Sequence, residues 1–284
     1  MTERAVSQGP TAPDAAPDAV PGAARAGTDA ASPRDLVPLF AWLSAGYPTG
    51  AFAYSHGLEQ AIAEGRVGDA DGLSAWLGDC IAHGAGRSEA LLLAEALSGD
   101  AAMADIRARA LAASRERLTE TAAQGAAFAA VTAAAWGRGA AGPATLPVAL
   151  GRAAREAGLA PAIVLPLALT AFAANLVAAA QRLMPIGQTA AQTVLAGLAP
   201  VIHATAEAVL ARVPADDPAN DLADDLADDP AATDRATADQ PDLSHDPWHD
   251  PWHDPWAGLH GTACLIGDIQ AMRHETLTVR LFRT

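Results

Sequence analysis

Glu59, His274 and Glu275 are the side chains of this sequence that could act as acid and base groups. A neighbouring His and Glu open the zinc-protease motif, but that motif needs a second His three residues further on, and none follows here. Nothing in the sequence places Glu59 beside the other two residues. A small all-α enzyme that uses these three groups remains an alternative, and we predict no catalytic residue.

Two further catalytic motifs are incomplete. Residues 53–57 read Ala-Tyr-Ser-His-Gly, and Ala53 stands where the nucleophile turn of hydrolases requires glycine. A phosphate-binding P-loop requires a lysine, and the sequence contains no lysine. The chain therefore cannot hydrolyse a nucleotide through a P-loop. An acidic chain without lysine also gives no sign of a nucleic-acid-binding surface.

The candidate metal ligands are poorly arranged. His245, His249 and His253 each open a His-Asp-Pro-Trp repeat, and proline at every fourth residue forbids the helix that would align them. Cys80 and Cys264 have no metal-type spacing, and two lone cysteines suit a reducing, cytoplasmic compartment. We predict no cofactor and no preformed metal site. A nickel store that uses the repeats remains an alternative.

Residues 268–284 are rich in the side chains that protein interfaces favour, because arginine and phenylalanine are enriched there. A terminus usually consists of small polar residues. The segment either folds back onto its own domain or docks a partner, and the residues alone do not separate the two. The candidate contact residues are Asp268, Arg273, His274, Glu275, Arg280, Leu281, Phe282 and Arg283.

A second candidate contact surface follows the first predicted helix. Proline and glycine set a tight turn there, and an aromatic ring, a hydroxyl and a carboxylate follow it next to a helix start. On a purely structural interpretation, Phe52 and Leu58 would fill the core. The candidate contact residues are Pro48, Gly50, Phe52, Tyr54, Ser55 and Glu59.

Helical periodicity dominates the sequence, and no run alternates long enough to predict a strand. The first helix has Ser32 as its N-cap, and Leu36, Leu39, Phe40 and Leu43 should form its buried stripe. Further helices are predicted over residues 55–64, 71–85, 88–98, 101–112, 115–136, 146–157, 161–183, 187–198 and 201–212. The fold class is all-α, a single compact bundle of about ten helices.

One apolar stretch, residues 159–180, is long enough to span a membrane. Pro161, Pro166, Thr170 and Asn175 interrupt it, and its alanine content makes it less apolar than a leucine-rich span. We therefore predict a central core helix. No membrane partner is expected.

Composition divides the chain into four regions. Residues 1–34 contain almost no large apolar side chain and are predicted to be a disordered arm without the features of a signal peptide. Residues 35–213 form the helical core. Residues 214–257 contain thirteen Asp and one Arg, which is most of the net charge of −15, and are predicted to be a disordered acidic insert. Residues 258–284 form the C-terminal segment.

The two candidate surfaces resemble segments of the urease accessory protein UreF family. Its front motif, Pro-x-Gly-x-Phe-x-Tyr-Ser-x-Gly-Leu-Glu, is matched at every position by residues 48–59. Residues 146–151 and 175–188, then Gln192, resemble later runs of that family, and residues 274–275 and 280–283 its end. The resemblance covers about residues 35–213 and 258–284, whereas the acidic insert departs from it.

The resemblance implies a non-catalytic helical scaffold. Members of the family dimerise and join the accessory protein UreD, also called UreH, and the GTPase UreG in delivering nickel to the urease apoprotein. The resemblance also implies that the C-terminal segment lies against UreD and that the turn at residues 48–59 faces UreG. Since the chain lacks a P-loop, nucleotide hydrolysis would belong to its partner.

Overall fold

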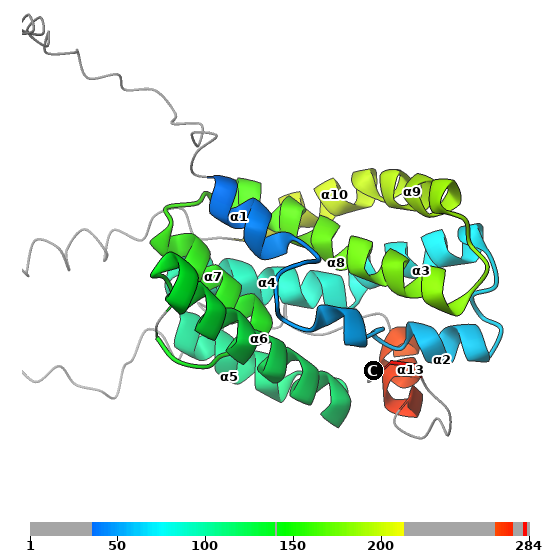
Figure 1. Cartoon of the computed structure of the whole chain (residues 1–284), viewed down its shortest axis with the longest axis horizontal. Coiled ribbons are helices and arrows are strands. Elements are labelled where there is room, and N and C mark those ends of the chain that lie inside the picture. Colours follow the sequence, from blue (N-terminus) through cyan, green and yellow to red (C-terminus); the bar gives the residue numbers. More distant parts are fainter. Residues whose placement is uncertain (1–35, 140, 213–264, 275–280, 283–284) are drawn as a thin grey trace, which may run out of the picture. The chain divides into compact units, whose positions relative to one another are not determined.

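The computed structural model of the chain describes residues 36–139, 141–212, 265–274 and 281–282 (Figure 1). The predicted N-cap at Ser32, the N-terminal arm and the acidic insert lie outside these residues. The helices are α1 (Leu36–Leu43), α2 (Leu58–Ala63), α3 (Ala70–His83), α4 (Ala85–Ser98), α5 (Ala101–Ala110), α6 (Arg115–Trp136), α7 (Leu146–Glu156), α8 (Pro161–Leu183), α9 (Gln188–Gly197), α10 (Ala199–Leu210) and α13 (Leu265–His274), with a short 3₁₀ turn, η1 (Ala51–Ala53). The prediction of an all-α fold is confirmed.

Local sequence signals explain where several helices begin. The side chain of Asp69 accepts a hydrogen bond from the backbone N–H of Gly72 at 2.8 Å, and this caps α3. Asp100 and Ser114 cap α5 and α6 in the same way. Prolines occupy the first turn of α7, α8 and α10, where the missing N–H costs nothing.

Helix α8 packs against α3, α4, α9 and α10 (Figure 1). Its buried face includes Val164, Leu165, Leu169 and Leu176. By length and composition alone, α8 and the stretch Gln188–Leu210 would each suffice to cross a membrane. The second stretch divides into α9 and α10 at Leu198. One face of α8 therefore belongs to the core, whereas Leu167 of the same helix is 44% exposed.

The predicted buried stripe of α1 is wrong at one position. Leu39 is fully buried, but the ring of Phe40 is 82% exposed. Trp42 takes the inward place, because its ring meets Phe128 and Trp136 of α6 edge to face, with centroids 6.0 and 6.1 Å apart. Packing of these large rings turns the helix, so that Phe40 faces outward.

Helices α6 and α7 approach closely because Gly125 has no side chain. A Cβ atom at this position would lie 2.0 Å from the backbone oxygen of Ala144 and 2.6 Å from the carbonyl carbon of Thr145. Neither atom can move without moving the backbone that leads into α7. The small residue at this crossing therefore fixes how near the two helices lie.

We expect Gly125→Ala to lower the free energy of unfolding by about 3 kcal/mol, because overpacking against backbone forces the two helices apart. The matched control is Gly78→Ala in α3, where a Cβ would meet nothing within 4 Å. That change should stabilise the protein by about 0.5–1 kcal/mol, as alanine does in a helix interior. Urea denaturation measures both variants. If Gly125→Ala and Gly78→Ala have equal free energies of unfolding, the α6–α7 contact is not tight.

Candidate partner-binding site

The turn that carries the front motif is anchored on α6. The hydroxyls of Tyr47 and Thr132 are 2.7 Å apart, and the ring of Tyr47 packs against Phe128. Gly50 has a φ of 78° and starts η1. Phe52 is 70% exposed, which contradicts the structural interpretation that this ring fills the core, whereas Leu58 is fully buried as predicted. The anchored turn thus holds an aromatic ring at the surface.

Glu59, in the first turn of α2, binds the C-terminal segment. Its Oε2 atom lies 2.9 Å from Nε2 of His274 and accepts a hydrogen bond from the backbone N–H of Phe282 at 3.0 Å. Its Oε1 atom accepts a hydrogen bond from the backbone N–H of Leu281. Nδ1 of His274 lies 2.9 Å from Glu116 of α6. We call these contacts the Glu59 junction.

The charge of Glu59 is stabilised by this arrangement. Burial alone would raise the pKa of its carboxyl, but the hydrogen bonds from His274, Leu281 and Phe282 outweigh burial and lower that pKa. Glu59 is therefore ionised at neutral pH. An ionised carboxylate makes stronger hydrogen bonds than a neutral one, so the segment is held by charge-assisted bonds.

A second contact joins α2 to α13. The carboxylate of Glu64 accepts hydrogen bonds from Gln270 at 2.8 Å and Arg273 at 2.9 Å. Arg66 and Gln60 bind the same carboxylate at 2.8 and 3.0 Å. These four donors lower the pKa of Glu64, but the group is exposed to solvent, so its contribution to stability is small.

Arg182, near the end of α8, connects the turn with the C-terminal segment. Its guanidinium donates a hydrogen bond to the backbone oxygen of Phe52 at 2.9 Å and lies 4.5 Å from the ring centroid of Phe282. A cation over an aromatic face is attracted by its quadrupole. Arg182 thus contacts both Phe52 and Phe282, which are 230 residues apart in the sequence, and so joins the front turn to the C-terminal segment.

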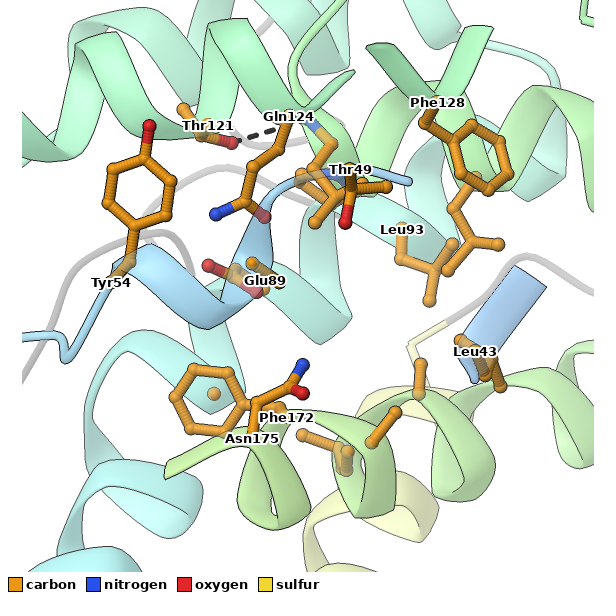
Figure 2. A pocket seen from close by; sticks show the side chains of 18 of the residues that line it. Leu43, Thr49, Tyr54, Glu89, Leu93, Thr121, Gln124, Phe128, Phe172 and Asn175 are labelled. Carbon is orange, nitrogen blue, oxygen red and sulfur yellow. Dashed lines mark hydrogen bonds between the residues drawn. The ribbon is translucent and has the colours of Figure 1, made fainter. Parts of the chain in front are cut away.

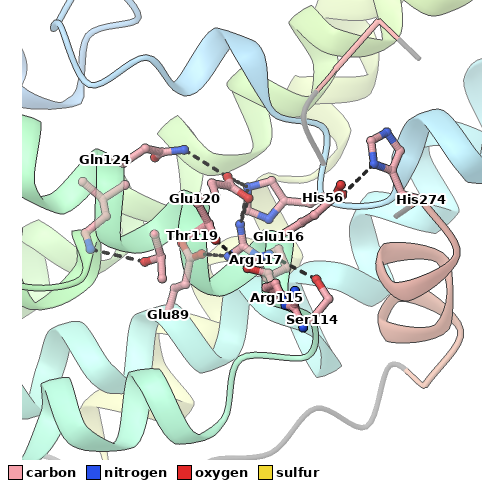
Figure 3. A network of polar contacts seen from close by, with 12 residues as sticks. His56, Glu89, Ser114, Arg115, Glu116, Arg117, Thr119, Glu120, Gln124 and His274 are labelled. Atoms are coloured by element: carbon pink, nitrogen blue, oxygen red, sulfur yellow. Dashed lines mark hydrogen bonds and ion pairs between the residues drawn. The ribbon is translucent and has the colours of Figure 1, made fainter. Parts of the chain in front are cut away.

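Behind the turn lies a buried ionic network (Figure 3). Arg117 of α6 pairs with Glu89 of α4 at 2.7 Å and also with Glu120. Glu120 also meets His56 at 3.1 Å and accepts a hydrogen bond from Gln124 at 3.0 Å. His56 has a φ of 52°, a strained conformation for a residue other than glycine. The network therefore fixes the backbone just before α2.

The sequence model of the UreF family matches residues 67–199 of the chain. The urease accessory protein UreF of Cereibacter sphaeroides is 47% identical over 251 residues, which cover 88% of this chain and 98% of that protein. The UreF proteins of Roseobacter denitrificans and Ruegeria pomeroyi are 42% and 37% identical, over 87% and 88% of this chain and 93% and 97% of their own lengths.

The chain belongs to the UreF family. The relatives are named as accessory proteins of urease, so this chain is a urease accessory protein and not an enzyme. The alternative of an acid/base enzyme is therefore wrong. Geometry agrees, because His274 is fully buried and the two oxygens of Glu59 are occupied by the C-terminal segment. Glu275 lies outside the described residues.

Burial separates the UreF-like contact residues into two groups. Tyr54, Ser55, Glu59, His274 and Phe282 are buried within the chain's own packing, so their described side chains position the segments instead of facing outward. Those that are exposed or partly exposed are Pro48, Gly50, Phe52, Arg273 and Leu281. The side chain of Asp268 and residues Glu275, Arg280 and Arg283 lie outside the described part.

Several residues of the site were missed by sequence reasoning. Glu64, Glu116 and Arg182 each bind the C-terminal segment, but no motif marks them. Glu64 stands at the end of the helix predicted over residues 55–64, but this position does not indicate that its carboxylate binds a distant segment. Among the described residues, no group of three or more His, Cys, Asp or Glu side chains could hold a metal ion.

Proposed function

We propose that this chain is the scaffold on which a nickel-delivery complex for urease assembles. In this proposal it forms a homodimer in the cytoplasm, and it bridges UreD, also called UreH, and the GTPase UreG so that nickel enters the urease apoprotein. The proposal rests on the Glu59 junction, since this joins the front turn to the C-terminal segment, the two segments whose motifs resemble the UreF family. A scaffold needs such a preorganised surface more than it needs catalytic groups.

The surface that we assign to docking consists of exposed side chains on both segments. Phe52 is 70% exposed, Leu281 64% and Met272 50%, and Ile269 is at the border of exposure. The side chain of Arg273 is about half exposed beside Glu64. Apolar anchors with arginine are the composition that interface cores favour. We call these five residues the docking surface.

The docking surface can be tested without disturbing the core. Phe52→Ser together with Leu281→Ser removes two exposed apolar side chains, so the helicity and the melting temperature should not change. Capture of UreD or UreG should weaken by about 2 kcal/mol or more if these side chains are hot spots. The measurement is biolayer interferometry with purified partners.

Phe40→Ser is the matched control, because this ring is 82% exposed but lies on α1, outside the docking surface. It should leave capture of both partners unchanged. If the double variant binds both partners as tightly as the unchanged chain does, the docking surface lies elsewhere.

A further inference from the structure

A cavity of about 120 Å³ lies beneath the front turn, between that turn and helices α4, α6, α7 and α8 (Figure 2). A space of this size holds about four water molecules, or the end of one long side chain. Its apolar walls include Trp42, Leu93, Phe128, Phe172 and Leu176. The cavity is therefore suited to a group that has an apolar stem.

Polar side chains also face this space. Figure 2 shows Thr49 of the turn, Glu89 of α4 and Asn175 of α8 around it. Glu89 accepts a hydrogen bond from Arg117 through Oε1. Within the described residues, the other oxygen of Glu89, the hydroxyl of Thr49 and the amide of Asn175 have no protein partner. Three acceptor-bearing groups from three elements thus converge on one cavity.

The charge of the cavity favours a cation. The carboxylates of Glu89 and Glu120 both pair with the guanidinium of Arg117, and Glu120 also pairs with His56, so the charge of Glu89 is the less compensated of the two. Glu120 is already bound by Arg117, His56 and Gln124, whereas Glu89 retains an unused oxygen. An anion would be repelled here, and a purely apolar group would leave the acceptors without donors.

A guanidinium group satisfies these conditions best. It presents five N–H donors in a plane, which matches acceptors that come from several directions, and it packs well against aromatic rings. Its three-carbon stem would lie along the apolar walls. The turn residues Ser44, Ala45 and Thr49 line the same cavity, so a protein that covers the turn would also reach it.

We propose that this cavity receives one arginine side chain of the protein partner that docks on the front turn, with Glu89 as its counter-ion. This inference rests on the proposed function, because it assumes that the turn is covered by UreD or UreG. The inference adds the chemistry of that contact, which is a guanidinium group bound by a carboxylate. The partner is expected to insert an arginine that is flanked by a surface complementary to the turn.

Glu89→Gln tests the inference, because it removes the charge but keeps the shape of the side chain. Capture of the partner should weaken roughly tenfold or more, as expected for a hydrogen bond to a charged group. Glu207→Gln is the matched control, since Glu207 is exposed on α10 and does not line the cavity. It should leave the affinity unchanged. Equal affinities of the two variants would overturn the inference.

Small competitors provide a second arm that needs no variant. n-Propylguanidinium should compete with the partner for the unchanged chain, whereas n-propylurea, which is neutral and similar in shape, should not. When arginines of the partner are replaced by glutamine one at a time, one replacement should weaken binding to the unchanged chain but weaken binding to Glu89→Gln much less. Competition by both compounds alike, or by neither, would contradict the inference. Because this experiment uses the unchanged chain, it is decisive even if Glu89→Gln does not fold.

Failure of the proposed function gives a different result. If the unchanged chain captures neither UreD nor UreG, the proposed function fails. If it captures a partner but n-propylguanidinium binds without displacing that partner, the cavity is a small-molecule site and the partner-arginine inference fails alone.

Discussion

Glu59→Ala should detach the C-terminal segment from α2 and abolish the capture of UreD or UreG. The substitution removes the acceptor of two backbone N–H groups and of the buried imidazole of His274. Each hydrogen bond to a charged group contributes about 1.5–3 kcal/mol, so the local cost should reach about 3 kcal/mol or more. Helices α3–α10 do not depend on these bonds and should stay folded.

Hydrogen exchange at the amides of Leu281 and Phe282 reports on the junction directly, because these amides donate to Glu59. Their protection should be lost in Glu59→Ala and partly kept in Glu59→Gln, which retains an acceptor oxygen but not the charge. Unchanged protection with unchanged capture of partners would show that Glu59 does not hold the segment.

The same junction should weaken in acid. The folded-state pKa of Glu59 is lower than its ordinary value of 4.5, so the folded state binds this proton less readily than the unfolded state does. Its stabilising contribution is complete above pH 4.5 and is lost as the pH falls through the lower, folded-state value. Loss of amide protection at Leu281 and Phe282 should therefore begin below the ordinary pKa of a glutamate.

Arg117→Ala should be the most destabilising single substitution in the core. It leaves the carboxylates of Glu89 and Glu120 without their shared cation, and Glu120 is 1% exposed. Removing one partner of a buried ion pair costs about 3–5 kcal/mol, because the remaining charge is uncompensated. Thermal unfolding followed by circular dichroism measures the effect.

Arg115→Ala is the matched control for this prediction, since Arg115 is exposed two residues earlier on the same helix. It should change the free energy of unfolding by less than about 0.5 kcal/mol. A loss of stability in Arg117→Ala no greater than in this control would show that the network contributes little. Burial opposes ionisation of Glu120, but Arg117 and His56 lower its pKa to about 2. The contribution of the ionic pair should thus be complete above pH 4.5 and be lost as the pH falls toward 2.

The helices could be predicted because their signals are local. Glycine and proline mark most helix ends, and the apolar run of α8 gave its bounds, Pro161–Leu183, as the structure has them. The stripe of α1 failed at Phe40, because the side that faces the core is decided by the rings of Phe128 and Trp136 on another helix. Helical periodicity alone does not show which apolar side chains of a short helix face the core when aromatic rings on another helix decide this.

The candidate site was only partly predictable for a related reason. The motif residues were found by resemblance, but the sequence left open whether the C-terminal segment folds back or docks a partner. In the structure, His274 and Phe282 are buried against the rest of the chain, whereas Leu281, which lies between them in the sequence, is exposed. Contacts such as Glu59 with His274 join residues that are more than 200 positions apart, and no local pattern encodes such a pair.

Reconstituted activation of urease tests the central claim most directly. Urease apoprotein, nickel, UreD and UreG are combined with GTP, and urease activity is measured with the unchanged chain, with the Glu59→Ala variant and without the chain. We predict activity with the unchanged chain only. Equal activity in the absence of the chain would contradict its role as the scaffold of nickel delivery.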